Sequence, residues 1–312
     1  MLRVYVLHHC MFHRYPVRIY NSLISNKDIP MPVPMTSSET GLEWIGSQTI
    51  RQCWLHRQLF LKLLKRDFSE RYQGSYLGLL WSFLLPLLSL LVFTFFFGII
   101  FKMRWEGQPQ GGSLGELALI LFIGMALYNF LAECLSRAPG LVLSHSGYVK
   151  NVVFPLEMLP VVMVASACLT LMVTFLAVLL LQFLIGHVLF WTTILLPIVF
   201  LPLLFFVLGL SGFLCSLGVY IRDIQQLITP LVQLLMFLSP VFYPINALPE
   251  FIRPWLQLNP LALVIEQARG IVLFGQLPAL MPYLISLFIG ILVMLAGTWW
   301  FVRTRKGFAD VL

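Results

Sequence analysis

The sequence predicts an all-α integral membrane protein with six transmembrane helices, an N-terminal amphipathic interfacial helix, and a re-entrant outer helical segment before the last span. Composition is the first observation, because the 312 residues are 59% hydrophobic and only 11% charged. A soluble domain has about 25% charged residues. The second is residues 77–101, which contain no ionisable side chain. About 25 helical residues at 1.5 Å each exceed the ~30 Å hydrocarbon core of a bilayer.

Residues 1–47 differ in composition from the rest and are interpreted as an N-terminal tail. We expect this tail to be disordered, or to lie partly upstream of the true start codon, with Met31 or Met35 as the real start. It lacks an uninterrupted apolar core that ends at a small-residue cleavage site, so it is not a signal peptide. Its histidines have no partner ligands at useful spacing, and no metal site is expected.

Residues 48–75 are predicted to form a cytoplasmic interfacial helix. Apolar side chains recur at helical spacing between Ile50 and Phe68, while most basic side chains fall on other faces. A basic helix with Trp and Phe on its apolar side suits the headgroup layer of a membrane. A helix that packs within a soluble structure is the alternative.

Six apolar stretches follow and make residues 76–305 a transmembrane domain, with residues 306–312 as a cytoplasmic tail. The predicted spans are Tyr76–Phe101, Leu114–Leu135, Leu156–Ile185, Val188–Tyr220, Ile224–Tyr243 and Pro278–Val302. Most Lys and Arg side chains outside the spans fall on the side of the N-terminus, so both termini are expected in the cytoplasm. On that side, Arg222 and Asp223 are placed to neutralise each other; a solvated ion pair is the alternative.

The inner segment at residues 136–155 is too long for a simple turn. Pro139 and Gly140 are expected to break the second span, and Leu141–Lys150 to form a short helix across the membrane face. Such a helix could receive force from a soluble partner. An ordinary loop explains the same residues equally well.

The outer segment Asn246–Leu277 contains Pro249 and the pair Asn259-Pro260, a favourable helix start with Asn as the cap and Pro in the first turn. In the following amphipathic stretch, Glu266 and Arg269 are spaced to pair on the polar side. Irregular backbone at membrane depth must be covered by protein or face a wet cavity. The segment is therefore a candidate lining of a pathway; an exposed loop is the alternative.

Several kinds of chemistry are absent from the sequence. It has no phosphate-binding loop, no HExxH or GxSxG motif, and no paired carboxylates within one span. Glu116, Glu133 and Glu157 lie near span ends, which argues against a proton relay. The net charge of +7 is concentrated beside span ends, so a nucleic-acid partner is not expected. We expect no catalytic residue, and no cofactor bound by this chain.

Several motifs resemble the permease subunits of type-2 ABC exporters for bacterial surface polysaccharides. The first lies at the start of the first span: Arg66, Asp67, Arg71, Tyr72, Ser75, Gly78, Trp81 and Pro86. Others follow in the family's order: residues 153–157, 220–224, 235–244, Leu248-Pro249 and Asn259-Pro260. The resemblance covers about residues 50–305 and departs from the family in the first ~35 residues.

This resemblance implies a homodimer in the bacterial inner membrane, with two copies of a separate ATPase subunit docked on its cytoplasmic face. ATP and Mg would bind that partner, and a lipid-linked glycan (O-antigen, capsule or teichoic acid) would pass between the two permease chains. The implied coupling helix contains Leu141, Ser144, His145, Gly147, Tyr148 and Lys150. The alternatives are an ABC exporter of small lipophilic compounds or drugs, and a membrane glycosyltransferase, which would need carboxylates in a sizeable loop.

Overall fold

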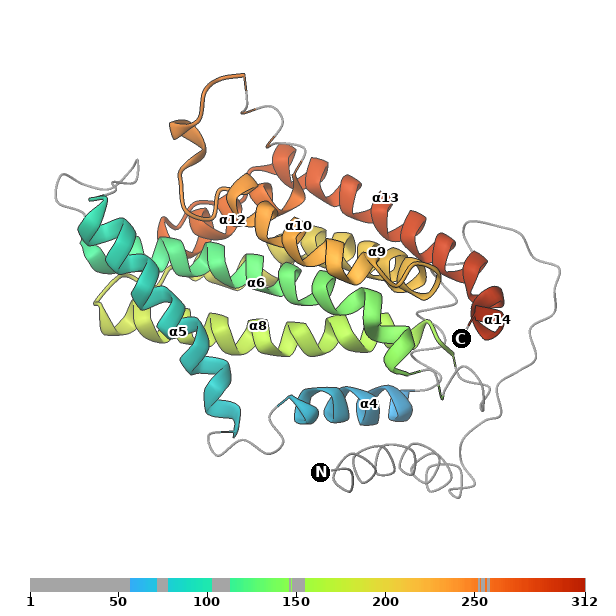
Figure 1. Cartoon of the computed structure of the whole chain (residues 1–312). Coiled ribbons are helices and arrows are strands. Elements are labelled where there is room, and N and C mark those ends of the chain that lie inside the picture. Colours follow the sequence, from blue (N-terminus) through green and yellow to red (C-terminus); the bar gives the residue numbers. More distant parts are fainter. Residues whose placement is uncertain are drawn as a thin grey trace.

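The computed structural model describes residues 57–71, 78–102, 113–145, 147, 155–251, 253, 256 and 259–311. In this part of the chain the regular elements are all helical (Figure 1). The longer helices are α4 (Arg57–Glu70), α5 (Trp81–Thr94), α6 (Leu114–Ser144), α8 (Met158–Leu184), α9 (Leu196–Tyr220), α10 (Ile224–Leu238), α12 (Pro260–Leu273) and α13 (Leu280–Thr304). Short 3-10 helices cover Gly78–Leu80, Trp191–Leu195, Ile245–Ala247 and Arg305–Gly307, a π-helix covers Phe95–Ile100, and α14 covers Phe308–Val311. The expected tail 1–47 lies outside the described residues.

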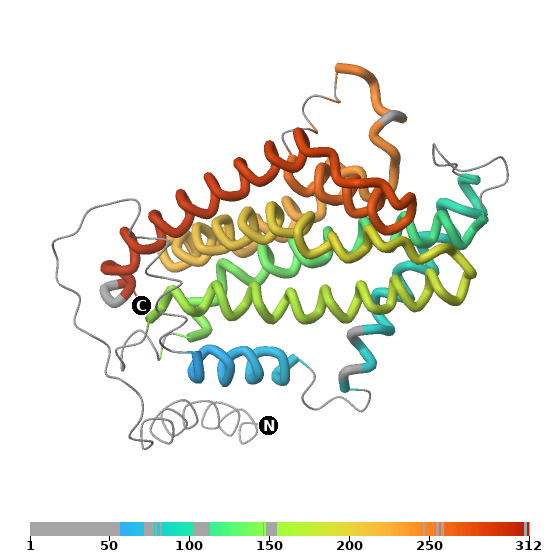
Figure 2. Tube along the Cα trace, turned by 180° about the vertical axis from the view of Figure 1, so that it is seen from behind, coloured from blue at the N-terminus to red at the C-terminus, as the bar shows by residue number. Residues whose placement is uncertain are grey.

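Within the described residues, five helical stretches are long and apolar enough to cross a membrane: Phe83–Ile100, Leu114–Ser144, Met158–Leu184, Trp191–Tyr220 and Leu280–Gly307. Four of them run side by side, and α5 crosses the face formed by α6 and α8 (Figures 1 and 2). We call the end of the bundle that carries His145, Tyr220 and Arg305 the proximal end. The opposite end, with Leu114 and Leu280, is the distal end.

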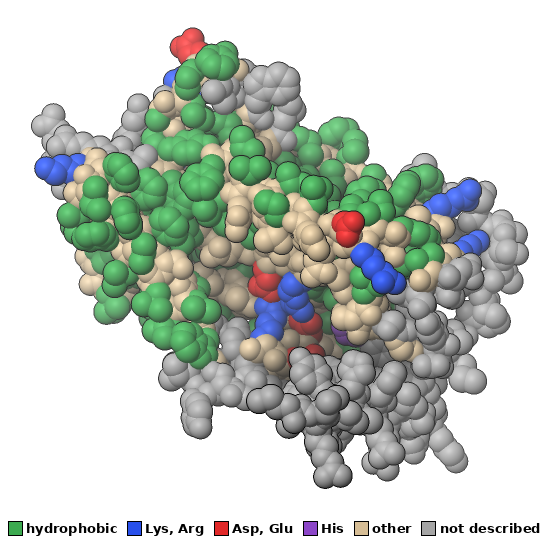
Figure 3. Space-filling model, in the orientation of Figure 1, with side chains coloured by type: hydrophobic (Ala, Val, Ile, Leu, Met, Phe, Trp, Pro, Cys, Tyr) green, Lys and Arg blue, Asp and Glu red, His purple; other side chains and the backbone are tan. Residues whose placement is uncertain are grey.

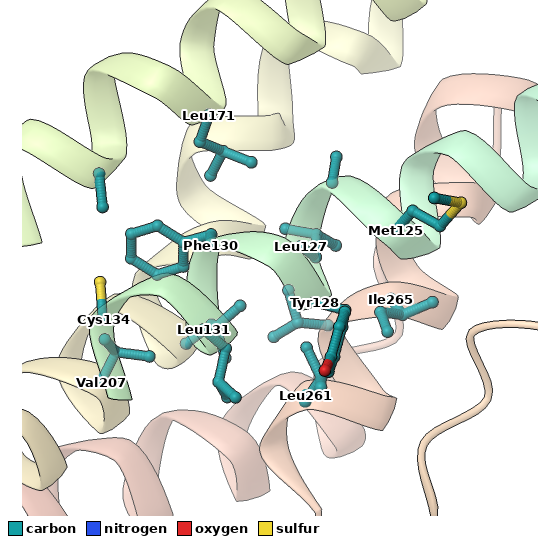
Figure 4. Packing of buried hydrophobic residues seen from close by; sticks show 14 of the residues in the cluster. Met125, Leu127, Tyr128, Phe130, Leu131, Cys134, Leu171, Val207, Leu261 and Ile265 are labelled. Carbon is teal, nitrogen blue, oxygen red and sulfur yellow. The ribbon is translucent and has the colours of Figure 1, made fainter. Parts of the chain in front are cut away.

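Helix α6 forms the centre of the bundle. Its side chains point in several directions, and Figure 4 shows Phe130 and Leu127 among residues of other helices. Leu171 of α8, Val207 of α9 and Leu261 of α12 belong to the same buried cluster. Most of the apolar side chains of α6 are buried, which agrees with this central place.

The predicted fifth span, Ile224–Tyr243, ends early, so the expectation of six spanning helices is not confirmed. Helix α10 has 15 residues, about 22 Å, which is short of the ~30 Å hydrocarbon core. Ser239 after it is extended, with φ −109° and ψ 150°. Pro240 explains this conformation, because a proline ring disfavours the helical conformation of the preceding residue.

Helix α12 does not cross the bundle; both of its ends are bound by side chains. At its start, the Asn259 side chain accepts a hydrogen bond from the Leu261 amide at 3.0 Å, which confirms the predicted cap. At its end, the Thr192 hydroxyl donates to the Ile271 carbonyl at 2.5 Å, and the Gln182 amide donates to the Val272 carbonyl at 3.1 Å. These bonds satisfy last-turn carbonyls that have no partner within the helix.

The predicted break at Pro139 and Gly140 does not occur, because α6 continues through both residues to Ser144. Pro139 removes one backbone donor, but neighbouring helices can compensate for a proline inside a transmembrane helix. Here α9 packs against it: a Cβ atom on Gly218 would lie 2.1 Å from the Pro139 carbonyl oxygen. The absence of a side chain at Gly218 therefore allows the two helices to approach at the proline.

The seam between α9 and α13 depends on small residues in the same way. A Cβ atom on Gly297 would lie 1.9 Å from the Gly209 carbonyl oxygen, and one on Gly290 would lie 2.4 Å from that of Pro202. Close backbone approach at small residues is the usual way in which helices associate in lipid. Pro202 itself lies inside α9, which continues through it to Tyr220.

The C-terminal segment is docked at the proximal end, although the sequence predicted only a cytoplasmic tail from residue 306. Phe308 is fully buried and packs edge-on against Tyr220 and Phe301. An ion pair joins Arg305 to Glu157, the residue that precedes α8. These contacts connect the end of the chain to both α8 and α9.

Candidate translocation face

A band of polar side chains runs along one face of α6 and the neighbouring α10. The two helices are aligned by two contacts: the Tyr128 hydroxyl donates to the Val232 carbonyl at 3.0 Å, and the Gln225 side-chain oxygen lies 3.3 Å from the position that a Cβ on Gly140 would take. We call this feature the polar band; it contains Asn129, Glu133, Ser136 and Arg137 of α6 and Gln225, Thr229 and Gln233 of α10.

The band is at the surface of the single chain. Within α10, every residue of which is described, only Val232 is buried, and the band's three α10 side chains are exposed. In Figure 3 a tan region separates green apolar surfaces, and acidic and basic side chains gather at its lower edge. Amide groups without partners are costly in hydrocarbon, so we expect the band to face water or another protein surface.

Four charged side chains form a network at the proximal part of the band: Asp67 of α4, Arg71 directly after it, and Glu133 and Arg137 of α6. Arg137 donates to Asp67 at 2.6 Å and contacts Glu133 at 3.3 Å. Arg71 forms an ion pair with Glu133 and lies 3.4 Å from Asp67. Arg71 also donates to the Thr170 hydroxyl of α8 at 3.1 Å. This ion network joins three helices with balanced charge.

The network fixes the charge state of Asp67. Burial alone raises the pKa of this carboxyl, but the hydrogen bond from Arg137 and the positive charges of Arg137 and Arg71 outweigh it, and the pKa lies below its ordinary value. Asp67 is therefore ionised at neutral pH, which keeps both arginines paired across the helix boundary.

The network also fixes how α4 lies. Leu63 of α4 lines a small hollow with Leu159 and Met163 near the start of α8, while Arg71 reaches Thr170 farther along. Helix α4 thus runs alongside the first half of α8, as Figures 1 and 2 show. The large exposed apolar side chains of α8 begin at Met172, so α4 covers the part of α8 before it.

At the distal end, Arg269 is the largest side chain that is fully buried. Its guanidinium donates to three backbone carbonyls, those of Ile120 at 3.1 Å, Pro240 at 2.7 Å and Val241 at 2.7 Å. It thereby joins α12 to α6 and to the turn after α10. The predicted pair with Glu266 is confirmed at 3.2 Å, but Arg269 does not lie on an exposed polar side as expected.

Gly124 makes room for this guanidinium. A Cβ atom at Gly124 would lie 2.5 Å from the Arg269 Nη2 atom. In an α-helix the Ile120 carbonyl faces the amide of the residue four positions on, which is Gly124. A residue without a side chain at that position leaves the carbonyl open to Arg269.

Comparison of the sequence with known proteins shows to which family the chain belongs. A family model described as ABC-2 type transporter matches residues 58–273, which is more than half of the chain. The chain belongs to the ABC-2 type transporter family. The matched part of this ABC-2 chain includes the polar band, the ion network and the Arg269 site, whereas α13 lies beyond it.

Curated relatives of this ABC-2 chain have modest identity over most of its length. It is 26% identical over 263 residues to the O-antigen export system permease protein RfbA of Myxococcus xanthus, covering 84% of this chain and 98% of the relative. An O-antigen export system permease protein RfbA of Klebsiella pneumoniae is 23% identical over 257 residues, covering 81% of this chain and 95% of the relative.

The motif residues around the first span of this ABC-2 chain are partly brought together. Asp67 and Arg71 join the ion network, while Arg66 pairs with Glu70 at 2.5 Å on the exposed side of α4. Gly78 has φ +49°, a left-handed conformation that glycine adopts without strain. The remaining motif residues lie apart: Trp81 begins α5 and Pro86 is inside it, and Tyr72 and Ser75 are outside the described residues.

The predicted coupling helix is not a separate element where the structure describes it. Leu141 and Ser144 lie in the last turn of α6, and His145 is the C-terminal cap of this helix. The Ser144 hydroxyl donates to the Leu141 carbonyl at 2.9 Å. Gly147 is helical, and Tyr148 and Lys150 lie outside the described residues.

The connection between α9 and α10 is formed by Ile221, Arg222 and Asp223. The Arg222 and Asp223 side chains are exposed, and among the ion pairs of the described residues none joins them. Their mutual neutralisation therefore stays a prediction. At the distal end, Pro249 is exposed, and Pro260 occupies the first position of α12 as predicted.

The sequence did not lead us to predict that Glu133, Arg137, Asn129 and the α10 glutamines form a polar surface. A signal was present, because Glu133 and Arg137 are spaced i, i+4 on one helix face. Gln225, Thr229 and Gln233 repeat every four residues within an apolar run. Such polar stripes in a membrane helix usually face the protein or a wet cavity rather than lipid.

Proposed function

We propose that this chain is the permease subunit of an ATP-driven exporter that moves lipid-linked surface polysaccharide across the bacterial inner membrane. O-antigen, capsule and teichoic acid are glycans of this class. The observation that carries the proposal is the similarity of this chain to a protein named as an O-antigen export system permease, 98% of whose length is covered. The chain also belongs to the ABC-2 type transporter family. The polar band gives that function a surface on which to act.

The transport path of this proposal lies between two copies of the chain. The band is on the surface of one chain, so a second copy facing it would enclose a polar path and remove the amides from lipid. Sugar hydroxyls can exchange hydrogen bonds with water for hydrogen bonds with Asn129, Gln225 and Gln233. The exposed apolar side chains of α5 beside the band, including Leu88 and Leu91, support a homodimer around the same path.

The proximal end is the cytoplasmic end in this proposal, with both termini there. Residues 141–150 dock a separate ATPase subunit, which binds ATP and Mg, while this chain holds no cofactor and has no catalytic residue. Helix α4 borders this surface at the membrane interface. The ion network transmits movement of α4 to α6, since a ligand shifts a conformational equilibrium only through differential contacts with its two states.

The distal end faces the outside in this proposal. Helix α10 and the turn at residues 239–244 together provide a sixth crossing, and α12 is a re-entrant helix that closes the path from outside. Arg269 and the Asn259 cap support this placement, because they satisfy backbone groups where the chain is irregular at membrane depth.

The experiment separates surface glycan from intracellular lipid-linked glycan in a deletion strain carrying wild type, Gln233→Leu or Leu234→Ala. Leu234 is the matched control, because it is 56% exposed on the apolar face of the same helix. We expect the deletion to remove surface glycan and accumulate lipid-linked glycan inside. Gln233→Leu should reproduce much of this loss, and Leu234→Ala should not.

Other outcomes contradict specific parts of the proposal. Unchanged surface glycan in the deletion strain, with raised sensitivity to lipophilic compounds, would indicate a small-molecule exporter. Loss of glycan from both pools would indicate a role in synthesis. Normal export by an inserted Gln233→Leu protein would remove the polar band from the path without affecting the assignment of the chain to export.

A further inference from the structure

A hollow of about 520 Å³ lies at the distal end, bordered by α12, the start of α13, Ile245, Arg253 and Leu256. Its size falls within the about 300–1,000 Å³ that is usual for small-molecule sites. None of the polar-band residues lines it. The hollow is therefore separate from the proposed transport path.

One wall of the hollow is apolar and continues onto the outer surface of α13. Leu277, Met281 and Ile285 line it, and they are 65%, 74% and 43% exposed. Because α13 is a candidate membrane span, we expect this surface to contact lipid chains. An alkyl chain can therefore enter the hollow without leaving an apolar environment.

The opposite wall offers hydrogen-bond acceptors. The Gln267 amide nitrogen donates to the Ala279 carbonyl at 3.2 Å, but its side-chain oxygen is buried with no partner. Glu266 keeps 35% of its side chain exposed beside Arg269. A buried acceptor without a donor is unfavourable, so this wall favours a ligand that carries N–H or O–H groups.

The charged side chains around the hollow further restrict the kind of ligand that fits it. Arg253 lines the same hollow as Glu266, so one cationic and one anionic side chain border it. A zwitterionic ligand with a phosphate and an ammonium matches both charges. Its ammonium needs N–H donors to bond with the carboxylate and amide oxygens, which a quaternary ammonium lacks.

We propose that this hollow binds one phosphatidylethanolamine molecule from the membrane. The ammonium donates to the oxygens of Glu266 and Gln267, and the phosphate lies on the Arg253 side. One acyl chain packs against Leu277, Met281 and Ile285. The proposal requires only that the chain is embedded in a membrane, and it does not depend on the transported cargo.

The test measures lipid binding to the delipidated full-length chain in detergent by native mass spectrometry. Phosphatidylethanolamine, phosphatidylcholine and phosphatidylglycerol with identical acyl chains are titrated separately. We expect phosphatidylethanolamine to bind about tenfold or more tightly than the other two, since loss of a charge-assisted bond costs at least that factor. Glu266→Gln should abolish this preference.

Two further variants keep the test decisive if Glu266→Gln does not fold. Met281→Trp fills the hollow from an exposed position and should weaken binding of all three lipids. Leu284→Trp is the matched control, since Leu284 is 54% exposed on the same helix and does not line the hollow. Equal affinity for the three lipids, or binding unchanged by Met281→Trp, would overturn the proposal.

Discussion

Replacement of Arg269 by leucine removes the side chain that joins α12 to the rest of the distal end. In the wild-type protein its guanidinium donates to the carbonyls of Ile120, Pro240 and Val241. Leucine approximates the volume of the aliphatic part but donates no hydrogen bond. The substitution therefore leaves buried carbonyl oxygens without a donor and Glu266 without its cation.

The magnitude follows from these contacts. The bonds to Pro240 and Val241, both 2.7 Å, are the short, charge-assisted kind, and such bonds contribute about 1.5–3 kcal/mol each. The bond to Ile120 is longer at 3.1 Å and contributes less. Removing the guanidinium also removes the free-energy cost of burying its charge, and this offsets part of the lost hydrogen-bond energy. We expect a net loss of about 4 kcal/mol, or roughly 10 °C in melting temperature.

The assay is the thermal midpoint of the detergent-solubilised protein, followed by fluorescence-detected gel filtration. Arg269→Lys should give an intermediate midpoint, because one ammonium cannot reach three carbonyls at once. Gly124→Ala should also destabilise, since its Cβ would displace Nη2, 2.5 Å away. A midpoint for Arg269→Leu within about 2 °C of wild type, a shift of 1 kcal/mol or less, would refute the reasoning.

A double-mutant cycle makes the same test stricter. If Gly124→Ala acts only by displacing the guanidinium, it should have little effect in a protein that already carries Arg269→Leu. Neighbouring sites that share one contact are expected to be non-additive in this way. Full additivity would mean that Gly124 has another role.

Three further predictions use the same thermal assay. Asp67→Asn should cost about 1–2 kcal/mol, because Arg137 loses a half-buried carboxylate partner; the difference from wild type should be constant above about pH 5 and disappear as pH falls through the lowered pKa of Asp67. Gly297→Ala should prevent stable folding or lower the midpoint strongly, whereas Gly212→Ala, with no atom nearer than 3.7 Å to the new Cβ, should be nearly neutral. Phe308→Ala should cost about 3–4 kcal/mol, since the ring is fully buried; a wild-type midpoint would show that the C-terminal segment is not docked in solution.

The membrane spans could be predicted because the requirement for apolar length is local. The predicted Leu156–Ile185 agrees with α8 at Met158–Leu184, and Pro278–Val302 agrees with α13 at Leu280–Thr304. The start of α12 was also predictable, because Asn259 as a cap acts on the next residues of the chain. Such features need no knowledge of the partner helices.

The sequence could not predict which prolines end a helix and which lie within one. Pro240 ends α10, while Pro139 is accommodated within α6. The difference lies in the neighbours: α9 packs against Pro139 at Gly218, and the buried Arg269 binds the carbonyls exposed at Pro240. Both supports come from distant parts of the chain.

Some residues of the candidate site could be identified from the sequence, but the contacts between them could not. Asp67 and Arg71 belonged to the motif, yet their partner Arg137 is 70 residues from Asp67 in the chain. Periodicity places charges on one helix and cannot pair them across two. The burial of Arg269 was unpredictable for the same reason, because its partners are carbonyls, which any residue could supply.

The glycine seam between α9 and α13 has a consequence for biosynthesis. Helix α13 is synthesised after α9, and it packs along α9 through Gly209 and Gly297. Until it is inserted, α9 presents a strip of bare backbone to the bilayer, and the docking place of Phe308 is vacant. A nascent or prematurely terminated chain that stops before Leu280 is thus an incomplete bundle that membrane proteases can distinguish from the finished subunit. Maturation of this permease therefore depends on the insertion of α13 against α9.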